Sequence, residues 1–113
     1  MSSEKNRIII NALEDLKAKD VVQLDVRELS QVMDTLVIAT GTSNRHVKSL
    51  ANNVVVDAKQ EGHPPLGVEG MESGDWVLVD FGDTVVHVMQ QETRDFYELE
   101  KLWSMEPSTR SET

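Results

Sequence analysis

The sequence predicts one α/β domain in which a mixed β-sheet is flanked by helices. Its 113 residues match the usual size of a single domain. Hydrophobic residues make up 39% and charged residues 27% of the chain, as in ordinary globular proteins. Helical and strand-like apolar patterns follow one another along the chain, which favours a sheet layered with helices. We expect residues 1–104 to form the domain and residues 105–113 a disordered C-terminal tail.

The first part of the chain predicts one helix and two strands. Over residues 3–19, apolar residues recur at helical spacing, at Ile8, Ile9, Ala12, Leu13 and Leu16. Residues 21–26 alternate loosely and predict a half-buried strand. Residues 35–40 (TLVIAT) are apolar and β-branched, which predicts a strand buried on both faces.

A second helix is predicted to begin after Thr42 or Ser43, either of which can cap it. Its apolar stripe runs toward Gly62 through Val47, Leu50, Ala51, Val54, Val55 and Ala58. The following His63-Pro64-Pro65 prevents further helix, because a residue before proline avoids the helical region. Residues 66–70 are predicted as either a short strand or an extended loop.

Residues 76–81 and 84–90 predict a β-hairpin. Gly82-Asp83 joins them and is typical of a two-residue turn, in which glycine supplies the positive φ. This turn fixes the register of the cross-strand pairs. One face then carries Phe81 with Thr84, Val79 with Val86, and Val77 with Val88. The other face carries Asp80 with Val85, Leu78 with His87, and Trp76 with Met89.

Residues 93–104 predict a single closing helix. Four of its side chains are interpreted as core, namely Phe96, Leu99, Leu102 and Trp103. Tyr97 lies about 100° around the helix from this stripe, with Arg94 and Glu98 on outward-facing turns. Tyrosine and arginine are frequent interface anchors. The simpler interpretation of Tyr97 is a boundary residue with its hydroxyl in water.

Charge and composition limit the class of partner. Twenty acidic against eleven basic residues give a net charge of −9, which opposes binding of a phosphate backbone over a broad face. The chain has no cysteine, so disulfides and thiolate chemistry are excluded. The longest apolar runs are far shorter than the roughly 20 residues that cross a bilayer, and no signal-type segment is visible. We expect a cytoplasmic protein that contacts no membrane.

The run GTSNRH at residues 41–46 is a candidate anion-binding site through Thr42, Ser43 and Arg45. Backbone amides at a helix N-terminus, with a cation nearby, suit a phosphate or a similar anion. The alternative is a capped helix start with solvated basic side chains. The run lacks the glycines of a P-loop or a dinucleotide fingerprint.

Asp80, Asp83 and His87 are candidates for a divalent metal site in a nucleotide-transferring enzyme. The predicted turn separates the two carboxylates and argues against their convergence. The three histidines His46, His63 and His87 have no metal-ligand spacing. We therefore expect no catalytic residues, no metal and no cofactor.

The hairpin face that carries Trp76, His87 and Met89 is a candidate protein-binding surface. Tryptophan and methionine are enriched in interfaces, and histidine can offer a polar tip. The alternative is that helices cover the sheet on both faces, which would make these residues part of a core.

Four motifs stand in order along the chain: GTSNRHVKSLA (41–51), PLGVEG (65–70), DWVLVDFGDTVVHVM (75–89) and RDFYELEKLW (94–103). Together they resemble the ribosomal silencing factor family, also called the Iojap family, and the resemblance covers residues 6–104. It implies a fold similar to nucleotidyltransferases, without their converging acidic residues and without enzymatic activity.

The resemblance further implies a factor that binds the large ribosomal subunit through ribosomal protein number fourteen, with limited contact to ribosomal RNA. By covering the intersubunit face, such a factor blocks joining of the small subunit and represses translation under nutrient limitation. The resemblance also implies a homodimer when the factor is free. The alternatives are a large-subunit assembly factor and a small nucleotidyltransferase-like, nucleotide-binding enzyme.

An acidic chain would be steered toward a basic ribosomal protein and repelled by bulk RNA. Val88 is included in the expected partner surface only as a neighbour, since its side chain points to the other face. The expected partner-binding residues are Glu69, Trp76, Asp80, His87, Val88, Met89, Arg94, Tyr97 and Glu98.

Overall fold

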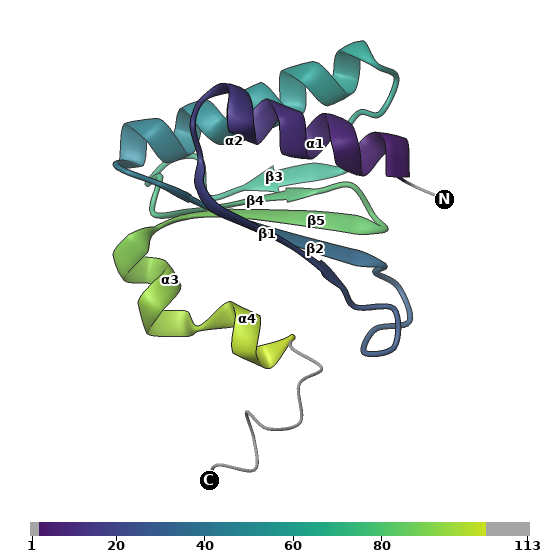
Figure 1. Cartoon of the computed structure of the whole chain (residues 1–113). Helices are drawn as coiled ribbons and strands as arrows, with labels where there is room; N and C mark the ends of the chain where they lie inside the picture. Colours follow the sequence, from purple (N-terminus) through teal and green to yellow (C-terminus); the bar gives the residue numbers. More distant parts are fainter. Residues whose placement is uncertain (1–2, 104–113) are drawn as a thin grey trace, which may run out of the picture.

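A five-stranded mixed sheet lies between two layers of helices (Figure 1). The computed structural model describes residues 3–103, so the expected tail at residues 105–113 lies outside the described part. The elements are α1 (Ser3–Asp15), β1 (Lys19–Asp25), β2 (Thr35–Gly41), α2 (Asn44–Gln60), β3 (Gly67–Glu69), β4 (Trp76–Asp80), β5 (Thr84–Gln90), α3 (Gln91–Tyr97) and α4 (Leu99–Leu102). The predicted α/β class with a mixed sheet is confirmed.

The strands lie in the order β1-β2-β5-β4-β3. The central strands β2 and β5 are parallel, and the other neighbouring pairs are antiparallel. The predicted hairpin is confirmed in its register, with Val79 opposite Val86 and Trp76 opposite Met89. Gly82 supplies the turn with a φ of 95°. The segment 66–70, predicted as strand or loop, contains the short edge strand β3.

Helices α1 and α2 pack side by side on one face of the sheet (Figure 1). Their predicted apolar stripes supply the main core on this face, where the β4–β5 hairpin presents its valines. The fully buried members from the two helices are Ile9, Ala12, Leu13, Val47, Leu50, Ala51, Val54 and Ala58. Val88 belongs to this core, which confirms the prediction that its side chain points to the same face as Val77 and Val79.

Helices α3 and α4 lie on the opposite face of the sheet (Figure 1). Under them is a second buried cluster, which consists of Val26, Met33, Leu36, Ile38, Met89 and Leu99. Helices therefore cover both faces, as the alternative interpretation of the hairpin face expected, and His87 and Met89 are buried there. Because α3 packs on β5 and β2, the β4 residues Trp76, Leu78 and Asp80 on this face keep part of their surface in solvent.

Helix α1 is shorter than the predicted 3–19 and ends at Asp15. Lys17 adopts a left-handed conformation with a φ of 62°, and the N–H of Ala18 donates to the carbonyl of Leu13 at 3.0 Å. This is the hydrogen-bond pattern of a Schellman motif, which stops a helix. β1 consequently begins two residues earlier than predicted. Helix α2 ends in the same way at Gly62, where the sequence offers the usual glycine.

The single closing helix predicted over residues 93–104 is wrong. The chain forms two short helices, α3 and α4, with Glu98 between them in a left-handed conformation (φ 48°, ψ 49°). This break changes the direction of the chain, so residues on its two sides no longer share one stripe. Leu99 is buried and Trp103 half-buried, but Phe96 and Leu102 are 79% and 72% exposed. The assignment of Phe96 and Leu102 to the core is therefore wrong.

Candidate functional site

Three aromatic side chains form a continuous row, two from α3 and one from β4, and we call Trp76, Tyr97 and Phe96 the aromatic strip. The ring centroids of Trp76 and Tyr97 are 4.7 Å apart. Those of Tyr97 and Phe96 are 4.9 Å apart in an edge-to-face arrangement. Tyr97 is 50% exposed, and Phe96 is the most exposed of the three. Large aromatic groups held outward against one another are typical of protein-binding surfaces.

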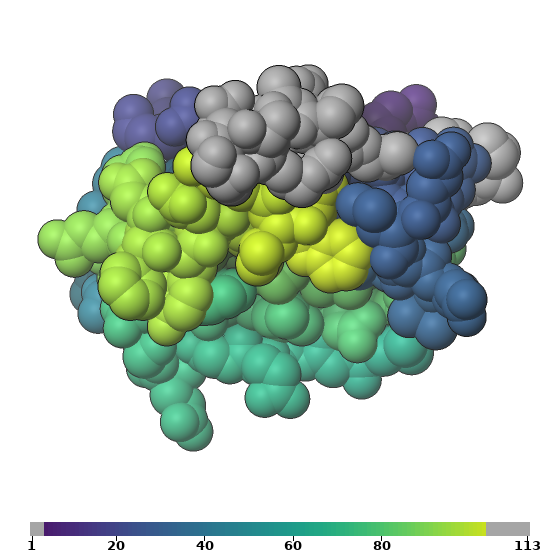
Figure 2. All heavy atoms as spheres, turned by 90° about the horizontal axis from the view of Figure 1, so that it is seen from below, coloured from purple at the N-terminus to yellow at the C-terminus, as the bar shows by residue number. Residues whose placement is uncertain are grey.

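Strand β4 continues this surface toward the edge of the sheet. Trp76, Leu78 and Asp80 are alternate residues of one strand and so point to the same face. The exposed Glu69 of β3 pairs with Leu78 and shares that face. Figure 2 looks onto this side, where the chain around β3 and β4, in teal and green, lies at the surface beside α3 and α4. The surface therefore combines aromatic and acidic groups.

The side chain of His87 lies beneath the aromatic strip. The indole Nε1–H of Trp76 donates to its Nδ1 at 2.9 Å, and the two ring centroids are 5.8 Å apart. Burial lowers the pKa of His87 from 6.5 to about 4, because the charged form would lose its hydration. The imidazole is consequently neutral near pH 7 and orients the tryptophan ring.

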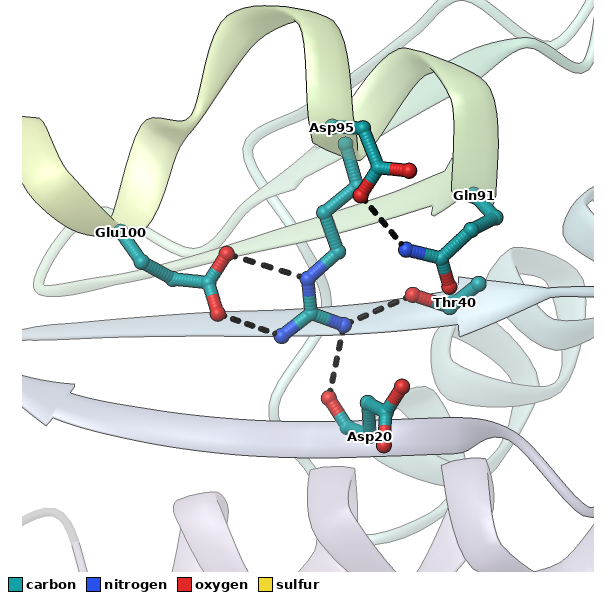
Figure 3. Close-up of polar contacts among 6 residues, drawn as sticks. Asp20, Thr40, Gln91, Asp95 and Glu100 are labelled. Atoms are coloured by element: carbon teal, nitrogen blue, oxygen red, sulfur yellow. Dashed lines mark hydrogen bonds and ion pairs between the residues drawn. The ribbon is translucent and has the colours of Figure 1, made fainter.

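Arg94 does not point outward, contrary to the prediction, and its side chain is 7% exposed. Its Nη1 donates to the backbone carbonyl of Asp20 and to the hydroxyl of Thr40, each at 2.7 Å (Figure 3). Its Nε and Nη2 donate to the two carboxylate oxygens of Glu100 at 3.1 and 2.7 Å (Figure 3). This bidentate pair lowers the pKa of Glu100. Arg94 thus connects α3 with β1, β2 and α4.

Several other predicted partner residues are inaccessible in the free chain. Met89 is fully buried under α3 and α4, and His87 is 7% exposed. Val88 faces the other core. The outward placement of Met89 and His87 is therefore wrong. Of the predicted residues on this side, Glu69, Tyr97 and Glu98 are exposed, and Trp76 and Asp80 are partly exposed.

The exposed Phe96 and Leu102 belong to this side of the molecule, and the sequence reasoning missed them as surface residues. One signal was available. Phe96 and Tyr97 are neighbours, and neighbours on a helix point about 100° apart, so a narrow buried stripe cannot take both. The break at Glu98 decides which of them is exposed more, and no glycine or proline marks that break.

The candidate anion site at Thr42, Ser43 and Arg45 is a helix start capped by its own side chains. Ser43 is the N-cap of α2 and its Oγ accepts from the N–H of His46 at 3.1 Å, which confirms the predicted cap. The N–H of Thr42 donates to Nδ1 of His46 at 2.9 Å. Nε2 of His46 then donates to the carbonyl of Leu16 at 2.7 Å. Two amides that an anion would use are therefore already engaged, and anion binding here stays a prediction.

The residues proposed for a metal in the nucleotide-transferring alternative do not converge. The carboxylate of Asp80 accepts from the N–H of Gly82 at 2.8 Å inside the turn. Asp83 pairs with Lys5 of α1. His87 is engaged by Trp76. Across residues 3–103, no group of three histidine or acidic side chains is placed to hold a metal ion.

No helix within the described part of the chain is both long and apolar enough to span a bilayer.

The fold and the site together define a small acidic α/β domain with a candidate docking surface built from aromatic and acidic side chains. Comparison with known proteins gives the family. The family model described as "Ribosomal silencing factor during starvation" matches residues 1–113. The chain belongs to the ribosomal silencing factor family, which confirms the resemblance seen in its motifs.

Individual relatives agree with this membership. The chain is 51% identical over 100 residues to a ribosomal silencing factor of Chromobacterium violaceum, covering 88% of this chain and 82% of that protein. A crystal structure of a protein from the same organism superposes with a TM-score of 0.91 at 48% identity, covering 94% of this chain and 88% of that one. A Mus musculus protein named "Mitochondrial assembly of ribosomal large subunit protein 1" is 36% identical, covering 87% of this chain and 44% of that protein.

Proposed function

We propose that this protein binds the large ribosomal subunit through ribosomal protein number fourteen and sterically prevents the small subunit from joining. Translation is thereby repressed when nutrients are limited. The observation that carries the proposal is the aromatic strip, in which the exposed rings of Phe96 and Tyr97 pack against each other and against Trp76 of the sheet. Preorganised aromatic side chains lose little conformational entropy on binding and are frequent hot spots of protein interfaces.

Charge supports a basic protein as the partner. The chain carries a net charge of −9, and Glu69 and Asp80 share the face of Trp76. An acidic surface attracts a basic protein and speeds their encounter, whereas ribosomal RNA repels it. Contacts to RNA are accordingly limited in this proposal, and the protein acts in the cytoplasm.

Binding to the large subunit is by itself enough to block subunit joining, so the proposed mechanism makes and breaks no covalent bond. A domain that covers a patch on the intersubunit face excludes the small subunit from that patch. The protein is a binding factor rather than an enzyme in this proposal. The expected likeness of its fold to nucleotidyltransferases assigns it no activity, because a fold does not by itself determine a function.

Sedimentation of the purified chain with separated large subunits tests the proposal. We expect co-migration with the large subunit, and a loss of joined ribosomes when small subunits are added. A matched variant with the strip removed, Tyr97→Ala with Phe96→Ala, should stay at the top of the gradient and leave joining unaffected. Failure of the unaltered chain to co-migrate, with joining intact, contradicts the proposal.

Assembly of the large subunit is the second candidate function. The printed name of the Mus musculus relative refers to such a role in mitochondria. The same docking surface would then act during maturation rather than under starvation. Ribosome profiles of growing cells that lack the protein distinguish the two, because an assembly role predicts accumulation of immature large subunits in rich medium and a silencing role predicts normal ones.

Self-association of the free chain is a further part of the proposal, supported by the family membership. Exposed apolar side chains such as Phe96 and Leu102 give a second copy a surface to cover. Sedimentation equilibrium over a range of concentrations should give a dimer. A monomer mass at every concentration would contradict self-association and would not affect the proposed docking to the ribosome.

A further inference from the structure

The buried guanidinium of Arg94 joins four elements at one point. Four of its five N–H groups have acceptors, in β1, β2 and α4, while its backbone belongs to α3. Tyr97 lies three residues further along the same short helix. The position of the aromatic strip relative to the sheet therefore depends on elements that Arg94 holds together.

We propose that Arg94 is a positioning residue for the aromatic strip, which holds α3 and α4 in the broken arrangement that seats Tyr97 on Trp76 and turns Phe96 outward. This inference rests on the proposed docking function of the strip. It replaces the expectation that Arg94 itself touches the partner.

The first argument is the break between the helices. Glu98 is left-handed, which is unfavourable for a residue with a Cβ, so the local sequence would otherwise favour one continuous helix. The N–H of Glu98 donates to the carbonyl of Arg94 at 2.9 Å, which closes α3. Something beyond local preference must therefore hold the break.

The spacing of Arg94 and Glu100 supplies the second argument. In a continuous helix, residues six positions apart point about 120° away from each other and cannot form a bidentate pair. The observed pair joins Arg94 in α3 to Glu100 in α4, with both carboxylate oxygens engaged. The ion pair is thus compatible with the broken arrangement and not with a straight helix.

The third argument is the chemistry of the side chain. A planar guanidinium can serve a carboxylate on one edge and two further oxygens on another, whereas a lysine ammonium has three donors and no fork. Loss of Arg94 also leaves the hydroxyl of Thr40, a residue only 2% exposed, without its donor. Lys101 and Glu98 form a contrasting pair nearby, at 3.4 Å and with more than half of each side chain exposed. Such a surface pair contributes little and gives a matched control.

The first experiment uses the free chain and needs no partner. Nuclear Overhauser contacts between the ring of Tyr97 and the indole of Trp76 are measured in the unaltered chain, Arg94→Lys, Glu100→Gln and Lys101→Gln. We expect strong contacts in the unaltered chain and in Lys101→Gln, and weakened or absent contacts in the other two. Should Arg94→Lys fail to fold, Glu100→Gln decides the matter, because it removes the ionic bidentate contact and keeps the side-chain shape. Undiminished contacts in every folded variant overturn the inference.

The second experiment is a double-mutant cycle on affinity for the large subunit. Tyr97→Ala should weaken binding roughly 10- to 100-fold when it is made in the unaltered chain. When it is made in the Glu100→Gln variant, it should weaken the binding of that variant by less than about threefold. If Arg94 and Glu100 only stabilise the fold, Tyr97→Ala costs the same in both backgrounds, and the positioning role is wrong. If the unaltered chain does not bind the subunit, the proposed function fails, while the Overhauser contacts still decide whether Arg94 positions the strip.

Discussion

Trp76 donates its indole N–H to Nδ1 of His87 at 2.9 Å, across two neighbouring strands. Because Nδ1 accepts this bond, the neutral imidazole carries its proton on Nε2. A second proton on Nδ1 would remove the acceptor and place a charge in a buried site. The orientation of Trp76, and through it the ring contact with Tyr97, is therefore linked to the protonation of His87.

Acidification should destabilise the fold through His87. Its pKa falls from 6.5 to about 4 on folding, so between these values the unfolded chain binds a proton that the folded chain does not. The stabilisation is complete above 6.5 and is lost as the pH falls toward 4. We expect the free energy of unfolding, from urea titrations, to drop by about 2 kcal/mol from about pH 7 to about pH 5 through this residue.

The control for that prediction is His87→Asn, whose amide oxygen can accept from Trp76 and does not titrate. Its stability should depend less steeply on pH over the same interval. An equal dependence in the two chains would assign the acid sensitivity to other groups.

Tyr97→Ala should weaken binding to the large subunit by about 1 to 3 kcal/mol, because it removes the central ring of the aromatic strip. Its effect on folding should be small, since half of the residue is exposed. Binding isotherms with purified subunits give the affinity. Val56→Ala serves as the control, because Val56 is 39% exposed on α2, on the other side of the sheet. Equal affinity of Tyr97→Ala and the unaltered chain would remove Tyr97 from the docking surface.

Asn6→Ala should destabilise the fold by about 1 to 3 kcal/mol. The amide of Asn6 donates to the hydroxyl of Thr35 at 3.3 Å and accepts from that of Thr84 at 2.9 Å, and all three residues are buried. Truncation leaves two threonine hydroxyls without partners. Chemical denaturation measures the change, and Asn11→Ala on the exposed side of α1 should stay within about 0.5 kcal/mol of the unaltered chain.

Lys17→Gly should stabilise the protein by about 1 kcal/mol. Lys17 is exposed and left-handed at the end of α1, a conformation that costs a residue with a Cβ about 1 to 2 kcal/mol and costs glycine much less. Thermal unfolding should show a higher midpoint. Glu14→Gly, inside the same helix, should lower the stability by roughly 0.5 to 1 kcal/mol, which separates the effect of position from that of glycine itself.

Magnesium with a nucleoside triphosphate should leave the melting temperature unchanged. A ligand that binds the folded state alone raises it, and Asp80 and Asp83 are held by Gly82 and Lys5 rather than directed at one point. A magnesium-dependent rise would instead favour the nucleotide-binding alternative. Thermal scans with magnesium alone and nucleotide alone provide the controls.

The sequence predicted the elements whose patterns are local. The β4–β5 hairpin follows from a Gly-Asp turn and two apolar runs. Its predicted register is therefore correct along the whole hairpin, including the pair of Trp76 and Met89. The cap of α2 at Ser43 and its end near Gly62 also depend on nearby residues. These features need no knowledge of distant contacts.

The closing segment could not be predicted in the same way. Nothing in the sequence around Glu98 breaks a helix, and the break is compatible with the bidentate pair between Arg94 and Glu100 and with bonds to distant strands. Arg94 was therefore expected outside and Phe96 inside, and both expectations are reversed. The candidate surface around Trp76 and Tyr97 was found, but which of its residues reach solvent depends on tertiary packing.

The position of β5 between β2 and β4 sets the order in which this chain can fold. While the chain is being synthesised, β1 can pair with β2 and β3 with β4, but each of these hairpins keeps a bare inner edge until β5 exists. The parallel β2–β5 pairing links residues 49 positions apart, such as Thr35 and Thr84, and pairings of this kind form slowly. The sheet of this proposed silencing factor is therefore complete only after Gln90, the last residue of β5, has emerged from the ribosome that synthesises it.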